Sequence, residues 1–313
     1  MNLGGQTKIN MSKVENNHVV HTPVLLKEVL ECLNPQPGES YLDLTAGYGG
    51  HAATILDQTN SPGKAVLIDR DQAAIAALRK QFGDGEVQII YSDYLSASHQ
   101  LDMEDTHFDM ILADLGASSL HFDNAERGFA FSNPGPLDMR MDQSQALTAA
   151  TILNTWKEAK IAQILYKYGQ EPKSRAIARR IVASRPLTTT DQLADIVSRV
   201  YHGYHRTHPA TKTFQALRIA VNDELAQLGD SLPIWTNLLA PGGRLAVISF
   251  HSLEDAIVKS YFAEVATDTY DAELRQITKK PLSAQIDEID SNPRARSAKL
   301  RAVAKINTKE RKN

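Results

Sequence analysis

Short apolar runs alternate with amphipathic stretches along the first third of the chain. Runs at residues 41–44, 65–69, 87–91 and 110–114 have the length and composition of buried strands. Between the second and third runs, apolar residues repeat at helical spacing over residues 71–82. Strands that alternate with helices form a parallel sheet with helical crossovers. The pattern therefore predicts an α/β domain whose ligand site lies at the carboxyl ends of the strands.

The residues before this region predict a tail and then a helix. Residues 1–18 are polar and show no periodicity, so we expect a disordered tail. Thr22 as N-cap and Pro23 at the first helical position predict a helix that ends before Pro35.

The alternation stops after residue 114 and resumes at an apolar run at residues 244–250. The 129 residues between them (114 to 244, exclusive) far exceed the dozen or so that a crossover requires. Their apolar stripes have helical spacing. We therefore expect a discontinuous α/β domain at residues 19–123 and 213–313, with an inserted helical domain at residues 124–212.

Composition and charge describe a globular protein without disulfides. Lys and Arg number 34 against 37 Asp and Glu, so any surface for nucleic acid must be local. Cys32 is the only cysteine, which excludes an intramolecular disulfide and favours a reducing compartment. No apolar run approaches the length of a membrane span, and the first 17 residues lack the apolar core of a signal peptide. We expect a cytoplasmic location and no membrane partner.

A local basic surface is predicted within the insert. Residues 172–218 hold nine Lys and Arg against two Asp, a balance of +7. Arg175 and Arg179 fall one turn apart on one helix face, where their guanidinium groups can both donate hydrogen bonds to phosphates. This distribution favours RNA or DNA binding, although Arg175 and Arg179 alone also fit a solvated basic helix.

Residues 41–51 (YLDLTAGYGGH) predict a strand, a glycine-rich turn and the start of a helix. Gly47, Gly49 and Gly50 can adopt positive φ and allow backbone N–H groups to approach a ligand closely. This predicts a nucleoside-cofactor site. The glycine spacing alone also fits the loose dinucleotide pattern of nicotinamide enzymes.

Three acidic residues sharpen this hypothesis. Asp43 precedes Gly47 by four residues, where a negative charge suits a sulfonium cation with a free amino-acid group better than a pyrophosphate. Asp69 ends the second strand and suits the hydroxyls of a ribose, and Asp114 ends the strand at residues 110–114. Each acid singly also fits a turn or a helix cap. Together they favour S-adenosylmethionine over NAD.

Further candidates lie at the same predicted edge. Tyr94 follows the strand at residues 87–91 and can lie against an adenine, although packing at the rim is nearly as good an interpretation. His251 follows the strand at residues 244–250, immediately before Ser252, which we expect to cap the next helix with Asp255 as its reciprocal partner. The glycine- and proline-rich loop at residues 126–142 is typical of a lid or a substrate channel.

Several long sequence blocks resemble one family. The blocks span residues 21–26, 49–51, 114–119, 125–129, 135–142, 208–215, 249–255 and 292–297. They are similar to the bacterial ribosomal small-subunit RNA methyltransferase H family, whose members methylate the N4 amine of a cytosine in 16S rRNA. The resemblance implies a class I S-adenosylmethionine-dependent methyltransferase, Rossmann-like with a mostly parallel sheet, carrying an inserted helical domain that helps bind RNA. It also implies 16S rRNA or the assembled small subunit as partner.

By motif match, the resemblance implies a set of residues that line the S-adenosylmethionine site: Gly49, Gly50, His51, Asp69, Tyr94, Asp114 and His121. We expect no resident metal. The N4 amine of cytosine is a poor nucleophile, so an acceptor for its N–H groups is needed. The Asp- or Asn-Pro-Pro-aromatic turn of many amino-methyltransferases is absent. We hypothesise that carbonyls of residues 114–116 serve instead, with Asp138 or His251 as catalytic side chains.

Three alternatives remain open on sequence. The glycine pattern admits a nicotinamide-dependent oxidoreductase, which Asp43 argues against. A non-catalytic RNA-binding assembly factor would keep the fold. A methyltransferase acting on a protein or a small molecule would make the basic insert dispensable.

Overall fold

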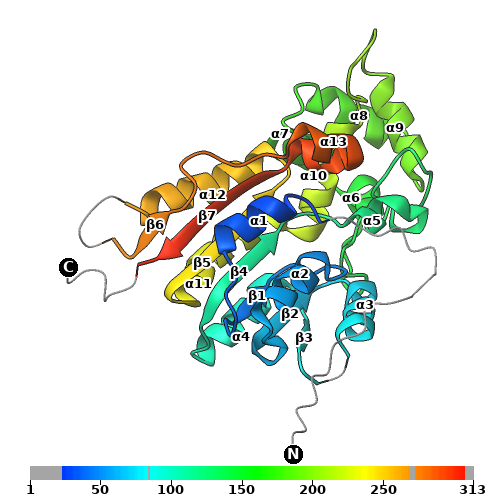
Figure 1. Cartoon of the computed structure of the whole chain (residues 1–313). Helices are drawn as coiled ribbons and strands as arrows, with labels where there is room; N and C mark the ends of the chain where they lie inside the picture. The colour runs from blue at the N-terminus through cyan, green and yellow to red at the C-terminus, as the bar shows by residue number, and fades with distance from the viewer. Residues whose placement is uncertain (1–22, 84, 268–271, 307–313) are drawn as a thin grey trace, which may run out of the picture.

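The computed structural model describes residues 23–83, 85–267 and 272–306. Seven strands form one sheet in the order β3-β2-β1-β4-β5-β7-β6 (Figure 1). The strands are β1 Tyr41–Asp43, β2 Ala65–Asp69, β3 Gln88–Tyr91, β4 Phe108–Asp114, β5 Leu239–Ser249, β6 Leu274–Gln276 and β7 Lys299–Lys305. Strands β1 to β5 are parallel, and β7 runs antiparallel to both β5 and β6. This topology confirms the predicted class I methyltransferase fold.

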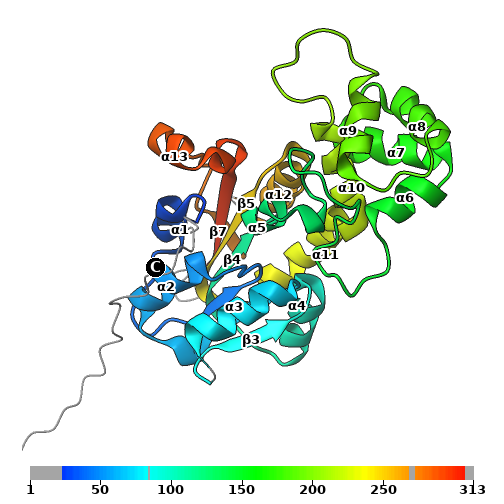
Figure 2. The same cartoon turned by 90° about the vertical axis from the view of Figure 1, so that its right-hand side faces the viewer.

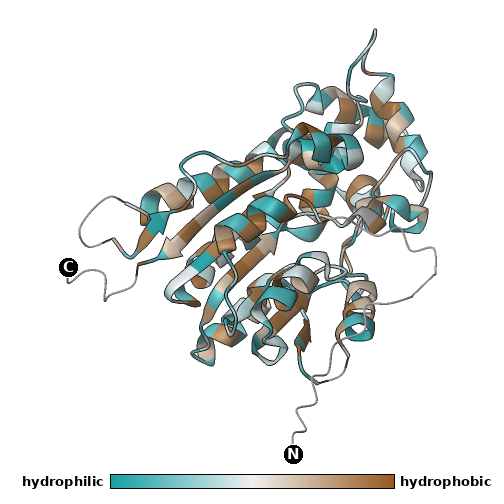
Figure 3. Cartoon of the chain, in the orientation of Figure 1, coloured by the Kyte–Doolittle hydropathy of each residue, from teal (hydrophilic) through white to brown (hydrophobic). Residues whose placement is uncertain are grey.

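Helices cover both faces of the sheet. Helices α1, α2 and α3 pack with one face, and α4, α11 and α12 pack with the other, each set around its own hydrophobic cluster. The central strands are largely apolar, while the helices carry mixed colours (Figure 3). These helices are α1 Leu26–Leu33, α2 Gly50–Thr59, α3 Gln72–Phe82, α4 Tyr94–Met103, α11 Glu224–Asn237 and α12 Ser252–Val265.

Five helices form a third hydrophobic cluster beyond the carboxyl edge of the sheet (Figure 2). They are α6 Ala149–Thr155, α7 Glu158–Gly169, α8 Ser174–Ala183, α9 Thr190–Ser198 and α10 Thr211–Asn222. Gly169 allows α7 to approach α10, because a Cβ there would lie 2.5 Å from the Lys212 carbonyl oxygen. The expected boundary at residue 212 falls within α10, whose apolar face packs in this cluster down to Val221.

Short elements complete the fold. Helix α5 Ser119–Asp123 follows β4, and α13 Ile286–Ser291 precedes β7. Single 3₁₀ turns lie at Pro62–Lys64, Ala125–Arg127 and Pro293–Ser297. None of the helices in the described part of the chain is both long and apolar enough to cross a bilayer.

Two element boundaries differ from the sequence prediction. Helix α1 begins at Leu26, three residues after Pro23, because Leu25 adopts a left-handed conformation with φ of 55°. The expected cap Thr22 and the expected tail lie outside the described residues. Apolar residues repeat at helical spacing over residues 213–228, which predicts one helix. The structure has two helices there, since Asp223 adopts a left-handed conformation between α10 and α11.

Candidate active site

The Asp69 side chain links the glycine turn to the end of β2. The Asp69 carboxylate accepts from the Gly47 N–H and from the Asp71 N–H, both at 2.7 Å. Gly47 and Gly49 have φ of 52° and 80°, which favours glycine at both positions. Asp69 therefore shapes the turn as well as standing at the predicted cofactor edge.

Packing explains two of the predicted glycines more directly than ligand approach does. A Cβ at Gly50 would lie 2.7 Å from Pro23 Cγ, and one at Gly49 would lie 2.8 Å from Phe82 Cε2. The missing side chains thus allow the segment before α1 and the end of α3 to close on the turn.

Three carboxyl groups gather at this edge. Burial raises the pKa of Asp43 to about 7, although hydrogen bonds from the Tyr41 hydroxyl at 2.7 Å and the Thr45 N–H at 3.2 Å lower it. Burial also raises the pKa of Asp69, and it raises the pKa of Asp114 well above its usual value.

These carboxyl groups act on one another. The charge of Asp69 raises the pKa of Asp43, and the charge of Asp43 raises that of Asp114. Asp114 Oδ1 is buried and has no hydrogen-bond partner among the described residues. A bound cation would relieve this repulsion and satisfy the buried oxygen, so the residues fit a sulfonium or ammonium group.

His51 lies beside Asp114, whereas Tyr94 contacts Trp235 and Glu224. His51 Nε2 is 3.0 Å from the Val24 carbonyl oxygen, and its Nδ1 is 3.9 Å from Asp114 Oδ2. The half-buried ring of Tyr94 meets Trp235 edge-on at 5.4 Å, and its hydroxyl donates to the Glu224 carbonyl at 3.3 Å. One side of the Tyr94 ring is therefore part of the core, and its predicted contact with an adenine stays a prediction.

His121 belongs to a buried ion-pair network. Its Nε2 lies 2.6 Å from Asp71 Oδ2, and its Nδ1 accepts from the Ser118 N–H at 3.0 Å. Arg127 Nη1 donates to the same Asp71 oxygen at 2.9 Å. Burial raises the pKa of Asp71, but these partners and the Ala73 N–H outweigh it and lower the value to about 2.

This network ties the predicted lid to the cofactor edge. Arg127 Nη2 also donates to the carbonyls of Arg140 and Met141, which fixes both ends of the loop. Sequence reasoning missed Asp71 and Arg127, although Asp71 stands two residues after a strand and caps α3.

A second network surrounds His251. Arg218 donates to both oxygens of Glu224, at 2.9 and 2.7 Å, and lies 4.0 Å from the buried Glu254 carboxylate. Glu254 in turn accepts from the Phe250 N–H at 2.8 Å and stands 3.3 Å from His251 Nε2. Its charge also raises the pKa of Asp114, so this network adjoins the acids.

His251 is itself the N-cap of α12, which corrects the expected cap at Ser252. Its Nδ1 accepts from the Glu254 N–H, and the Glu254 carboxylate accepts from the His251 N–H, both at 3.3 Å. Asp255, the expected reciprocal partner, instead pairs with Arg301 at 2.7 Å and Lys299 at 3.0 Å. Burial and the Arg218 charge lower the pKa of His251 to about 4, so the ring is neutral near pH 7 with its proton on Nε2.

The same cluster contains the donor types of a cation site. One ligand atom each from Glu224, His251 and Glu254 lies within 4.8 Å of the others. However, Arg218 already supplies a positive charge at both acids, and His251 Nδ1 is occupied by the cap while Nε2 carries the proton. A neutral imidazole in this state has no lone pair for a metal. The arrangement is that of an ion-pair network.

Asp138, the other predicted catalytic side chain, is engaged by Arg140. Its carboxylate accepts from Arg140 Nε at 2.9 Å and from Arg140 Nη2 at 2.7 Å. Although burial raises it, the pKa of Asp138 is lowered overall by these bonds. Asp138 is therefore held as a carboxylate that shapes the loop at residues 138–142.

Part of the predicted basic face is exposed. Arg175, Arg179 and Arg180 of α8 point away from the buried Ile177 and Ile181. Four of the nine bases have structural contacts. Arg218 pairs with Glu224, and Arg185 donates to the Leu153 carbonyl at 2.6 Å. Lys173 and Lys212 donate to the carbonyls of Val200 and Gln170.

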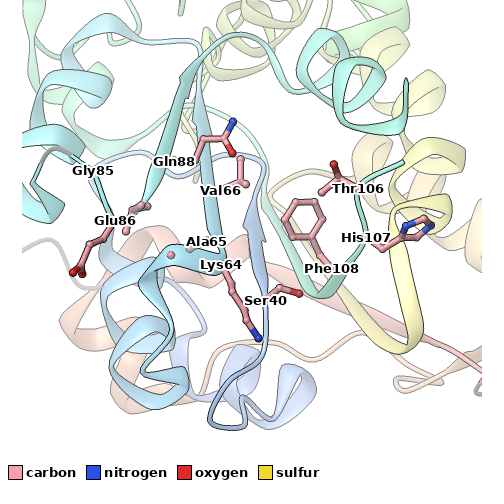
Figure 4. A pocket seen from close by; sticks show the side chains of 12 residues that line it. Ser40, Lys64, Ala65, Val66, Gly85, Glu86, Gln88, Thr106, His107 and Phe108 are labelled. Atoms are coloured by element: carbon pink, nitrogen blue, oxygen red, sulfur yellow. The ribbon is translucent and has the colours of Figure 1, made fainter. Parts of the chain in front are cut away.

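An open pocket of about 580 Å³ lies at the opposite edge of the sheet (Figure 4). It is lined by the first residues of β2, β3 and β4, with polar groups such as Lys64, Glu86 and His107. None of the predicted site residues lines it, because all of them follow the carboxyl ends of strands.

Comparison with known proteins gives close matches over nearly the whole chain. The family model described as MraW methylase family matches residues 18–306. The Ribosomal RNA small subunit methyltransferase H of Nostoc punctiforme is 45% identical over 306 residues, covering 96% of this chain and 98% of that protein. The protein of the same name from Heliobacterium modesticaldum is 46% identical over 310 residues, covering 91% of this chain and 98% of its own length.

Proposed function

The chain belongs to the MraW methylase family, and on this premise we propose that it transfers a methyl group from S-adenosylmethionine to the N4 amine of a cytosine in 16S ribosomal RNA. The observation that carries the proposal is the match at about 45% identity, along nearly the full length, to relatives named for small-subunit ribosomal RNA methylation. The grouped acids at the carboxyl edge of the sheet support it independently.

The cofactor is S-adenosylmethionine, which supplies an electrophilic methyl group on a sulfonium when bound. Its proposed site is lined by Gly49, Gly50, His51, Asp69, Tyr94, Asp114 and His121. Asp69 stands where a ribose is recognised in this fold class. Asp43 and the unpartnered Oδ1 of Asp114 suit the cationic part of the cofactor.

The turn after β4 is the proposed acceptor for the cytosine amine. Carbonyl oxygens of residues 114–116 can accept the amine N–H groups, which localises the lone pair of the nucleophile. Gly116 has φ of 94°, and a Cβ there would lie 3.7 Å from Phe250 and 3.8 Å from Arg218. Phe250 and Arg218 thus lie beside this turn. Positioning of the nucleophile can account for much of the rate acceleration.

His251 and Asp138 act as positioning residues in this proposal. His251 caps α12 and adjoins Arg218, which lies beside the turn at Gly116. Asp138 fixes Arg140 within the loop that Arg127 ties to the cofactor edge.

The substrate is an unpaired or flipped cytosine, because the amine is inaccessible within a duplex. The exposed arginines of α8 suit phosphate contacts. We propose the cytoplasm as the site of action and either 16S rRNA or the assembled small subunit as the partner.

The test measures N4-methylcytosine by mass spectrometry in small-subunit RNA from cells with and without the protein. The purified chain is then incubated with that RNA and methyl-labelled S-adenosylmethionine. Loss of one modified cytosine in the deletion strain and its restoration in vitro are expected. An unchanged RNA modification pattern, or RNA binding without labelled methyl, would overturn the proposal in favour of an assembly factor. Thermal shifts with S-adenosylmethionine and with NAD separate it from an oxidoreductase.

A further inference from the structure

The loop between α9 and α10, residues 199–210, projects away from the rest of the molecule (Figures 1 and 2). On this loop the aromatic side chain of Tyr204 is exposed, with 93% of its surface accessible. The Tyr204 ring contacts no other ring and makes no hydrogen bond with any described residue. A tyrosine in this position contributes nothing to the core and leaves a flat apolar face open to solvent.

Neighbouring rings form a surface beside Tyr204. An open pocket of about 410 Å³ is lined by Ser198, Tyr201, Gly203, Tyr204, His205, His208 and Pro209. Tyr201 meets His205 edge-on at 5.3 Å, and the ammonium of Lys173 lies 4.2 Å from the centre of the Tyr201 ring. His208 stacks on Phe131 at 4.4 Å, which anchors the end of the loop to the third hydrophobic cluster.

The charged side chains of the loop itself have one sign, and the Glu171 carboxylate that accepts from the Tyr201 hydroxyl is buried. Between Asp195 and Asp223 the chain contains no acidic residue, while Arg199 and Arg206 are exposed on the loop itself. Exposed aromatic rings among basic side chains are the combination that binds single-stranded nucleic acid, in which bases stack on rings and phosphates pair with cations.

The loop is also connected directly to the site. Helix α10 begins at Thr211, and Arg218, which lies beside Gly116 of the acceptor turn, stands seven residues along it. At the usual rise per residue, this separation is about 10 Å along the helix axis. The end of the loop that joins α10 therefore lies close to the acceptor turn.

We propose that residues 201–208 form a stacking site for unpaired bases of the RNA that flank the modified cytosine, with Tyr204 as the principal platform. The proposal rests on the proposed function and adds a recognition site to it. It predicts that the enzyme binds single-stranded RNA more tightly than duplex RNA through this loop.

The test uses the full-length chain and a fluorescein-labelled single-stranded RNA of about ten nucleotides, read by fluorescence polarisation, beside the matched duplex. Tyr204→Ala is expected to weaken binding of the single strand about 5- to 150-fold, the range for loss of one stacked base. Tyr166→Ala is the matched control, because Tyr166 is also exposed, at 69%, but lies on α7. It is expected to leave binding unchanged.

Tyr204→Trp keeps a stacking face, so it should restore binding, and its added indole emission should be quenched by the single strand. Unchanged single-strand affinity in Tyr204→Ala, or an equal loss for the duplex, would overturn the proposal. So would a loss seen only with the assembled subunit, which would indicate a protein partner. Methylation of small-subunit RNA by the unaltered chain is measured in parallel. Methylation without a role of Tyr204 in binding would contradict the stacking proposal alone, whereas no methylation would contradict the proposed function.

Discussion

Arg218 and Glu224 are joined by two parallel hydrogen bonds, from Nε to Oε1 at 2.9 Å and from Nη2 to Oε2 at 2.7 Å. Because Glu254 lies 4.0 Å from the same guanidinium, one cation balances two buried acids. Arg218→Ala should lower the free energy of unfolding by about 3 to 5 kcal/mol, the usual cost of stranding a buried charge. Urea denaturation measures this, with the exposed Arg79→Ala as control. Equal denaturation midpoints for the two variants would contradict the prediction.

The contact between Gly50 and Pro23 gives a second prediction. Gly50→Ala would place a Cβ 2.7 Å from Pro23 Cγ and should destabilise the fold by about 1 to 3 kcal/mol through overpacking. Gly229→Ala is the matched control, since Gly229 lies in α11 with no atom within 4 Å of its added Cβ. That change should stabilise the protein by about 0.5 to 1 kcal/mol. Thermal unfolding of both variants tests the opposite signs.

The raised pKa of Asp43, about 7, predicts a pH dependence. A carboxyl whose pKa is higher in the folded state binds more protons there than in the unfolded chain. The free energy of unfolding without cofactor should therefore fall as pH rises from about 4 through about 7. Affinity for the cationic cofactor should rise over the same range, because the ionised carboxylate attracts it. Asp43→Asn should flatten both trends. Thermal melting from pH 5 to 8, with and without S-adenosylmethionine, measures them.

Single-turnover methylation tests His251. His251→Ala should lower the methylation rate while cofactor affinity stays nearly intact, because the cap of α12 is lost. His251→Asn retains an N-cap acceptor and should keep most of the rate. With a pKa of about 4, His251 should give no inflection in the rate between pH 5.5 and 8. Full turnover in His251→Ala would remove the residue from the mechanism.

The loop at residues 138–142 provides a parallel test. Asp138→Ala releases Arg140 from its carboxylate partner and should slow methylation without changing affinity for S-adenosylmethionine. Asp57→Ala, at an exposed position of α2, serves as control. A rate equal to that of the control would show that the loop does not need this ion pair.

The sheet could be predicted from sequence because its strands are buried on both faces and read as continuous apolar runs. The strand expected at residues 65–69 has those bounds in the structure. The cap of α12 could not be placed, since Ser252 with Asp255 and His251 with Glu254 have the same spacing. In the folded chain Arg301 pairs with Asp255, so Asp255 does not serve as the partner of an N-cap at Ser252.

The ion-pair networks around the site could not be predicted from the sequence either, because their members are far apart in the chain. Asp71 and Arg127 are 56 residues apart, and Arg218 meets Glu254 across 36 residues (254 minus 218). Helix and strand periodicities in the sequence do not indicate contacts between residues so far apart. The three strand acids were predicted to converge because parallel strands place their carboxyl ends at one edge, and Asp43, Asp69 and Asp114 do influence one another there.

Strand β7 is the last strand of the described residues, yet it lies between β5 and β6. During synthesis, the backbone N–H and C=O groups along one edge of β5 stay unpaired until residues 299–305 have left the ribosome. The order of translation thus leaves completion of the sheet to its final strand. A chain truncated before residue 299 would keep every acid at the carboxyl edge but expose β5 as an open edge prone to aggregation.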